Sequence, residues 1–283
     1  MKRIIFGACL VFHVATLCAS NSNEELGQGQ KPYLTASILG QIGNTMFQIA
    51  TASAVAWEHG AEAYFPELPI RPVLYQHFFS RCKSTPPSDE ISVDRNDGFP
   101  IVFEPKMRLQ GYFQEERYFA RYRDKLIALF APIARDVKYI QKKYESIVSQ
   151  PNTVGVQIRY YRREVVDGYP QYGRRYLEKA MALFPENSLF IVSSDNLSYA
   201  RDQIPSWAKN VIFLEGEPSY IDFYILSLCK DNIITNSSFG WWSAWLNQNP
   251  HKKVVCPSFW TGISTEDIFP LDWLRIEAQS EDL

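Results

Sequence analysis

The stretch Val154-Gly155-Val156-Gln157-Ile158-Arg159 is a short apolar run that ends in a permanent cation. Its length and composition are typical of a buried strand, and the irregular segment 160–164 that follows marks the end of that strand. Open α/β folds bind ligands at the carboxyl ends of parallel strands. Because a guanidinium matches phosphate oxygens in a bidentate way, Arg159 at such an end predicts a diphosphate ligand. The alternative is an edge arginine that pairs with a surface carboxylate.

Two later apolar runs, residues 188–194 and 232–235, also end in polar side chains. The polar residues at these ends are Ser194, Asp195, Asn236, Ser237 and Ser238. Strand and helix patterns alternate along the chain, which predicts parallel sheets with helices on their faces. The three strand ends would then meet at one sheet edge and offer a cation, hydroxyls and a carboxylate. Since neither a P-loop nor a dinucleotide glycine motif is present, we interpret this edge as a nucleotide-sugar site of another kind.

Composition supports a globular protein and excludes one class of partner. The chain has 283 residues, of which 46% are hydrophobic and 21% charged. This length suits one large or two smaller domains with a substantial core. A balance of 29 Lys and Arg against 31 Asp and Glu gives a net charge of -2. We therefore expect no nucleic-acid partner, which would require a basic excess.

The N-terminus has the pattern of a targeting segment. Lys2 and Arg3 precede the apolar run 4–19, and polar residues follow it. We expect residues 1–20 to be a signal peptide or a membrane anchor and residues 21–32 to be a disordered spacer. An anchor of this orientation would attach the chain to a membrane and leave its body in a secretory lumen.

The body of the chain divides at a linker candidate, Gln150–Asn152. We expect one domain over residues 33–150 and a second over residues 151–283. The cysteines outside the targeting segment are Cys82, Cys229 and Cys256, and the histidines there are His59, His77 and His251. No spacing among them predicts a zinc site or a disulfide scaffold, although one bridge stays open. We expect Cys229 and Cys256 in the core and the histidines at the surface or at helix ends.

A glycine loop opens the first domain. Residues 33–39 predict a strand, Gly40 and Gly43 lie in the turn after it, and a helical pattern then continues to His59. The glycines permit close backbone approach, and Asn44 is a candidate helix cap. This arrangement places backbone N–H groups in front of an anion or a sugar, although a tight turn alone would also explain it.

Four blocks of this sequence resemble the α1,2-fucosyltransferases of glycosyltransferase family 11. The blocks are Gly40–Gln48 (GQIGNTMFQ), Leu109–Gln114 (LQGYFQ), the opening stretch Val154–Arg159, and Asp222–Cys229 followed by Ile233–Asn247 (IITNSSFGWWSAWLN). They follow the family's order from about Gly40 to Trp260. The block with Asn-Ser-Ser-Phe-Gly-Trp-Trp is the most specific of them.

The resemblance implies a GT-B-like α/β fold in which two Rossmann-like parallel-sheet halves face a cleft. Residues 33–150 would form the acceptor side, and residues 151–283 would bind GDP-fucose. It implies inverting, metal-independent transfer of L-fucose to a galactose hydroxyl of a glycan, with no cofactor. A secretory enzyme of this kind would lie in the Golgi lumen; a bacterial one would be membrane-associated or exported.

The resemblance also assigns the site residues. Arg159 would stabilise the departing GDP. The donor-binding candidates are Gly43, Asn44, Gln157, Arg159, Asp195, Asp222, Asn236, Ser237, Ser238 and Phe239. Asp222 has a second interpretation, in which it holds the strand-end loops by hydrogen bonds. We expect Ser219 to cap the helix that carries Asp222, and the tryptophans 241, 242 and 245 to pack in the core.

One departure from the family pattern affects the chemistry. Where the family shows His-X-Arg-Arg-X-Asp, this chain has Gln157, Tyr160 and Arg162 in place of the histidine, the second arginine and the aspartate. The motif therefore leaves the base that activates the acceptor unassigned. Asp167 and Glu164 on the following loop could take its place, and Asp167 is our candidate, against the alternative that it is a solvated loop residue. The alternatives to α1,2-fucosyl transfer are another linkage, another GDP-sugar, or a catalytically silent relative that binds GDP or a glycan.

Overall fold

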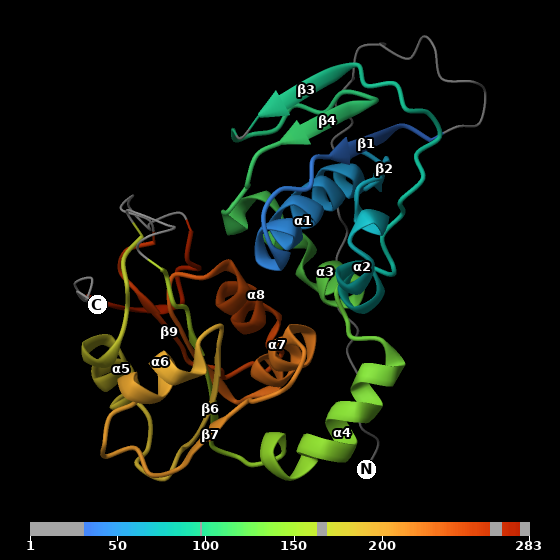
Figure 1. The fold of residues 1–283 in the computed structure, drawn as a ribbon. Coiled ribbons are helices and arrows are strands. Elements are labelled where there is room, and N and C mark those ends of the chain that lie inside the picture. The colour runs from blue at the N-terminus through green and yellow to red at the C-terminus, as the bar shows by residue number, and fades with distance from the viewer. Residues whose placement is uncertain (1–30, 97, 163–168, 261–267, 278–283) are drawn as a thin grey trace, which may run out of the picture. The chain divides into compact units, whose positions relative to one another are not determined.

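The computed structural model describes residues 31–96, 98–162, 169–260 and 268–277 (Figure 1). Residues 32–283 form one compact unit. Within the described residues, none of the helices has the length and apolar character needed to cross a membrane. The predicted targeting segment, residues 1–20, and nearly all of the predicted spacer lie outside the described residues.

The first half of the chain contains a parallel four-stranded sheet of order β2-β1-β4-β3. Its strands are β1 (Tyr33–Ala36), β2 (Glu62–Tyr64), β3 (Val93–Asn96) and β4 (Met107–Gln110). Its helices are α1 (Ile42–Glu58), η1 (Leu68–Ile70), α2 (Pro72–Phe78), η2 (Glu116–Tyr118), η3 (Ala120–Tyr122), α3 (Arg123–Leu129) and α4 (Ala134–Val148). Helix α1 is buried on nearly all sides, in accord with its mostly apolar and small residues.

The second half contains a parallel six-stranded sheet of order β10-β9-β8-β5-β6-β7. Its strands are β5 (Thr153–Ile158), β6 (Leu189–Ser194), β7 (Val211–Phe213), β8 (Asp231–Ile234), β9 (Val254–Pro257) and β10 (Leu274–Ile276). Its helices are α5 (Arg174–Met181), α6 (Leu197–Gln203), α7 (Ser219–Leu228) and α8 (Ser238–Leu246). Every residue of β5 is buried, as expected for a strand whose two faces are both covered. The two parallel α/β halves agree with the predicted fold.

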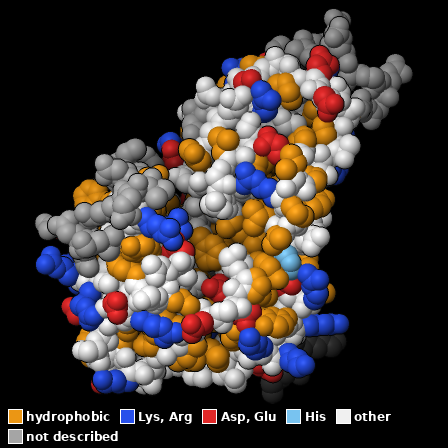
Figure 2. Space-filling view, in the orientation of Figure 1, with side chains coloured by type: hydrophobic (Ala, Val, Ile, Leu, Met, Phe, Trp, Pro, Cys, Tyr) orange, Lys and Arg blue, Asp and Glu red, His pale blue; other side chains and the backbone are white. Residues whose placement is uncertain are grey.

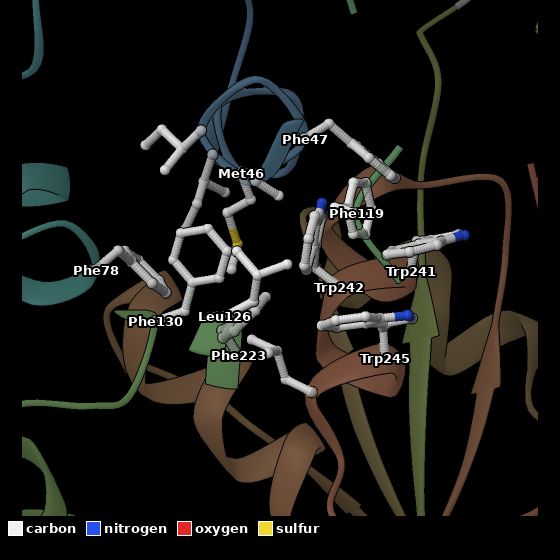
Figure 3. Packing of buried hydrophobic residues seen from close by; sticks show 14 of the residues in the cluster. Met46, Phe47, Phe78, Phe119, Leu126, Phe130, Phe223, Trp241, Trp242 and Trp245 are labelled. Atoms are coloured by element: carbon white, nitrogen blue, oxygen red, sulfur yellow. The ribbon is translucent and has the colours of Figure 1, made fainter. Parts of the chain in front are cut away.

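An aromatic cluster joins helices α1 and α8 in the core. The ring centroid of Phe47 on α1 lies 4.6 Å from that of Trp241 and 5.1 Å from that of Trp242 on α8 (Figure 3). Phe119 stacks on Trp242 at 5.2 Å, and Trp245 completes the cluster. The tryptophans are at most 2% exposed, which confirms that they pack in the core. Burial of such rings is among the larger stabilising terms available to a core.

Gly43 allows the two helices to approach closely. A Cβ atom built on Gly43 would lie 2.4 Å from the backbone carbonyl carbon of Ser238 and 2.5 Å from its Oγ. No side chain larger than hydrogen fits there without moving one helix. Gly43 therefore lies in the first turn of α1 rather than in the predicted turn, and it permits a close approach to the start of α8. Its predicted contact with a ligand stays a prediction.

Two predicted helix caps were wrong. Helix α1 begins at Ile42, so Asn44 lies inside its first turn, and Ser219 is the first residue of α7 after Pro218, so neither side chain caps its helix. His77 lies in the last turn of α2, as expected for a helix end, and it is buried there with its Nδ1 2.6 Å from Oδ2 of Asp136.

Other local predictions hold. The three cysteines outside the targeting segment are buried and free, so Cys229 and Cys256 are core residues as expected. The division into domains at residue 150 falls between β4 and β5, and it stays a prediction because the halves share one hydrophobic cluster. Lys and Arg side chains are interspersed with Asp and Glu over the face in view, in keeping with the small net charge (Figure 2).

Candidate active site

Three strand ends meet at one edge of the second sheet. Strand β5 lies between β8 and β6, and all three run parallel. The polar residues after them therefore lie side by side, as the alternation of strands and helices predicted. Arg159 follows β5, Asp195 follows β6 and Asn236 follows β8.

Arg159 is held at this edge by contacts from both neighbouring strand ends. Its Nη1 donates to Oδ2 of Asp195 at 2.5 Å, and its backbone N–H donates to Oγ1 of Thr235 at 3.0 Å. The guanidinium lies 5.2 Å from the ring centroid of Tyr161. Its side chain is 39% exposed, so part of the guanidinium remains accessible to an anion.

Asp195 forms an ion pair with Arg159. The pairing of this arginine with a carboxylate, which was the alternative to a diphosphate ligand, is therefore present. The same carboxylate also accepts the backbone N–H of Tyr160 through Oδ1 at 2.9 Å. This second bond fixes Asp195 against the turn after β5. The carboxylate thereby orients the guanidinium, which remains half exposed.

Gln157 is only 4% exposed and is engaged within the protein. Its Oε1 accepts from Oγ1 of Thr235 at 3.2 Å, and a Cβ built on Gly240 would lie 2.8 Å from the same oxygen. The side chain therefore lies between β8 and the first turn of α8. In this position it supports Thr235, which in turn holds the backbone of Arg159.

Asn236 is buried and its amide joins two loops. Its Nδ2 donates to the carbonyls of Pro170 and Trp260, both at 2.9 Å. The backbone carbonyl of Asn236 accepts from the hydroxyl of Tyr161 at 2.7 Å. Burial raises the pKa of Tyr161, so this hydroxyl stays protonated as a donor. Asn236 thus fixes the geometry of the edge.

Asp222 is a buried carboxylate in the first turn of α7, next to the end of β6. Its Oδ2 accepts from Oγ of Ser193 at 2.7 Å, whereas Oδ1 has no partner among the described residues. Burial raises the pKa of Asp222 to about 7, and the hydrogen bond from Ser193 opposes this rise. A buried acceptor without a partner is costly, so this oxygen is suited to a ligand donor.

The N-termini of α1 and α8 meet at the contact between Gly43 and Ser238. No side chain caps either helix, where Gln41 and Ser237 occupy the cap positions. The free N–H groups of a first turn and the helix dipole both favour an anion, and two such ends in contact favour it more strongly. Next to Gly43, Oδ1 of Asn44 accepts from Nε2 of Gln114 at 2.8 Å.

The remaining predicted residues have different surroundings. Ser237 is nearly buried, and Phe239 packs edge-on against Phe223 with ring centroids 5.3 Å apart. Asp167 lies outside the described residues. Among residues that the structure describes, His, Cys, Asp and Glu form no group that could hold a metal ion.

Sequence reasoning missed three supporting residues. Thr235 links Gln157 to Arg159, Ser193 donates to Asp222, and Tyr161 joins the guanidinium to Asn236. Thr235 and Ser193 could have been identified from their positions at the carboxyl ends of predicted buried strands. Nothing in the sequence distinguished Tyr161 from the other tyrosines of the same loop.

A cavity of about 580 Å³ lies elsewhere. It is lined by mostly apolar residues of α3, α4 and α7 and of the segments before β8 and β9. Lys230 and Asn249 are among these residues, at the amino edge of the second sheet. None of the predicted site residues lines it. A diphosphate requires cations and N–H groups, so we place the site at the carboxyl edge.

A family model matches residues 97–277, and its description is glycosyl transferase family 11. The chain belongs to this family. It is therefore a glycosyltransferase, as its motifs predicted. The match covers all of the second sheet and the three strand ends described above.

Two relatives are similar to most of this chain. The alpha-1,2-colitosyltransferase of Escherichia coli is 28% identical over 226 residues, which cover 75% of this chain and 76% of the relative. The galactoside alpha-(1,2)-fucosyltransferase 2 of Oryctolagus cuniculus is 28% identical over 237 residues, which cover 75% of this chain and 66% of that protein.

Solved structures share the fold. A mutant of Arabidopsis thaliana FUT1 in complex with GDP superposes with a TM-score of 0.54 at 13% identity, over 81% of this chain and 71% of that one. POFUT1 in complex with GDP gives 0.51 at 10% identity, over 82% of this chain and 99% of that one. Together with the two parallel sheets, these similarities show the GT-B-like architecture.

Proposed function

We propose that the chain is a galactoside α1,2-fucosyltransferase, which transfers L-fucose from GDP-fucose to a galactose hydroxyl of a glycan with inversion. The meeting of two uncapped helix N-termini at Gly43 and Ser238 carries this proposal. A diphosphate has the charge and the acceptor oxygens that these N–H groups require. Arg159 adds the cation at the neighbouring strand end.

The reaction requires only a direct displacement. The acceptor oxygen bonds to the anomeric carbon of fucose, the bond from that carbon to the GDP oxygen breaks, and its electron pair stays on the phosphate. The acceptor proton passes to a base. Arg159 and the two helix ends stabilise the charge that grows on GDP, and preorganised charge of this kind is usually the largest catalytic contribution.

Asp222 is the candidate for recognition of the base. Guanine presents N–H donors from its ring and from its exocyclic amine, and an ionised carboxylate accepts both. Oδ1 of Asp222 is buried and unpartnered among the described residues, while Ser193 fixes the other oxygen. The hydrogen bond from Ser193 fits the second interpretation, in which Asp222 only holds the strand-end loops. Asp195 and Gln157 then act by positioning Arg159 and Thr235.

Asp167 is proposed as the base that accepts the acceptor proton. It follows the segment in which the family carries an aspartate, and it lies outside the described residues. Replacement by Asn should lower kcat at least tenfold and leave GDP affinity unchanged, because general bases contribute about 10²- to 10⁴-fold. An unaltered kcat would remove Asp167 from the mechanism.

The colitosyltransferase relative favours one alternative, transfer of a different sugar with the same linkage. The test is incubation of the purified chain with radiolabelled GDP-fucose and lactose, followed by linkage analysis of the product. Transfer in α1,2 linkage supports the proposal, and another linkage or a preference for a GDP-colitose donor supports an alternative. GDP binding without transfer indicates a silent relative. Absence of GDP binding overturns the proposal.

For localisation, we propose attachment to the Golgi membrane through residues 1–20, with the body in the lumen. The basic start and the apolar run 4–19 support this. Export or membrane association in a bacterium is the alternative. Sequencing the mature N-terminus tests it, since an intact Met1 or Lys2 indicates an anchor and a start near residue 20 indicates a cleaved signal peptide.

A further inference from the structure

The carboxyl edge of the first sheet carries a second group of side chains. Strands β2, β1 and β4 are consecutive neighbours in this sheet and run parallel. The segments that follow them, residues 65–67, 37–41 and 111–114, therefore emerge at the same edge. Such edges are where open α/β sheets bind ligands.

Buried and half-buried polar groups fasten these segments together. Gln48 of α1 accepts the N–H of Leu39 through Oε1 at 3.0 Å and donates from Nε2 to the carbonyl of Gly111 at 3.0 Å. Arg71 donates to the carbonyl of Gly40 at 2.6 Å. The loop after β1 is thus held to the loop after β4 and to the start of α2, which preorganises this edge.

Two side chains of different character flank the loop after β1. Tyr112 follows Gly111 after β4 and is 48% exposed, and Leu39, which Gln48 joins to Gly111, is 42% exposed. Glu67 follows β2 and is exposed, and its Oε2 accepts the N–H of Ile38 at 3.3 Å. Arg108 interacts with Glu67 electrostatically but directs its hydrogen bonds to Asp94, and no described residue forms a hydrogen-bonded ion pair with Glu67. One of its oxygens is therefore free to accept from a ligand.

This combination matches a sugar ring. A pyranose presents hydroxyl donors along its rim and an apolar C–H face, which an aromatic ring covers well. A carboxylate is an acceptor-only group that binds hydroxyls strongly. The edge is also continuous with the donor site, because Asn44 and Gln114 join the loops next to the Gly43–Ser238 contact.

We propose that Tyr112 and Glu67 bind the acceptor galactoside, with the ring of Tyr112 against its C–H face and the carboxylate of Glu67 on one of its hydroxyls. This assignment rests on the proposed function, since it names the acceptor subsite of the same reaction. It differs from a purely structural role, in which Glu67 only holds the N–H of Ile38 and Tyr112 only covers the loop.

The test is to measure the binding of methyl β-D-galactoside to the full chain by saturation-transfer NMR, with and without GDP. Tyr112→Ala should weaken galactoside binding about two- to tenfold, and Glu67→Gln about ten- to a hundredfold. Tyr112→Phe should bind as the wild type, because it keeps the ring. GDP affinity, measured by calorimetry in the same samples, should change less than about twofold in all variants.

Matched controls come from the second half of the chain. Trp207→Ala removes an aromatic side chain of similar exposure, 40%, and Glu186→Gln neutralises an exposed carboxylate. Both should bind the galactoside as the wild type does. Unchanged binding in Tyr112→Ala and Glu67→Gln, equal losses in the controls, or no galactoside binding by a wild-type chain that binds GDP would each overturn the inference. Failure of GDP binding alone would overturn the proposed function, because the galactoside titration is also made without GDP.

Discussion

The carboxyl edges of the two sheets are built differently. At the edge of the second sheet, predicted donor residues such as Gln157 and Asn236 are buried and hydrogen-bonded within the protein. At the edge of the first sheet, Tyr112 and Glu67 are exposed and only the loop beneath them is fastened.

This difference fits two kinds of ligand. A diphosphate has a fixed charge and shape, so a rigid edge with few free groups recognises it at low reorganisation cost. An acceptor sugar is neutral and is bound by an aromatic face and a few hydrogen bonds. The comparison therefore predicts large effects from changes at the second edge and smaller ones at the first.

The largest effect is expected from Arg159→Ala. Loss of the cation at the leaving group should lower kcat about 10²- to 10³-fold, the range found when one preorganised donor is removed. Arg201→Ala is the matched control, because Arg201 also pairs with a carboxylate and lies over a ring, 4.3 Å from the centroid of Phe213. Radiolabel transfer measures both variants. An Arg159→Ala enzyme with wild-type kcat would contradict the assigned role.

Gly43→Ala tests whether the contact between the two helices is needed. The added methyl group would lie 2.4 Å from the backbone of Ser238, so one helix must shift, at a cost of about 1–3 kcal/mol in the free energy of unfolding. GDP affinity should fall in parallel, because the two helix ends separate. Gly98→Ala is the control, since nothing lies within 4 Å of a Cβ built there. Equal melting temperatures in the two variants would refute the close contact.

Asp222→Asn separates ligand binding from stability. The pKa of about 7 means that Asp222 ionises between pH 6 and 8, and GDP should bind more weakly as pH falls through 7 because the protonated form accepts fewer hydrogen bonds. The Asn variant should lose about tenfold or more in GDP affinity and lose this pH dependence.

The stability of the unliganded protein should respond to pH in the opposite direction. The pKa of Asp222 is raised in the folded state, so its contribution is present at low pH and is lost as pH rises through about 7. Asp222→Asn should remove that slope without unfolding the protein. Urea titrations at pH 5 and pH 8 measure it. If the affinity for GDP is the same at pH 5 and pH 8, Asp222 does not contact the nucleotide.

The smallest effect is expected from Arg71→Ala at the first edge. Its hydrogen bond to the carbonyl of Gly40 is partly exposed, so its loss should cost about 0.5–1.5 kcal/mol of stability. GDP affinity should stay within twofold of the wild type. Thermal unfolding and calorimetry check both values. A loss of GDP affinity as large as that of Gly43→Ala would mean that the two edges are not distinct.

Local patterns predicted the strands and helices well because burial on both faces leaves a clear apolar signature, as in β5. They failed at helix starts. Asn44 and Ser219 are residue types that cap helices, but they lie one or more positions after the cap positions, which Gln41 and Pro218 occupy. They placed His77 at a helix end, as found, but could not predict its buried contact with Asp136, a residue 59 positions away. The motif resemblance predicted a donor site at this edge, and it could not say which of the residues there are engaged internally.

By itself, the sequence determined the parallel α/β class, the order of strands with polar ends and the family, because these follow from local periodicity and from short motifs. Only the tertiary structure decided that Gly43 meets Ser238, that Asp222 keeps one oxygen unpartnered among the described residues, and that Glu67 and Tyr112 flank one loop. These features join residues far apart in the chain, and their relation depends on strand order and helix packing, which no local pattern encodes.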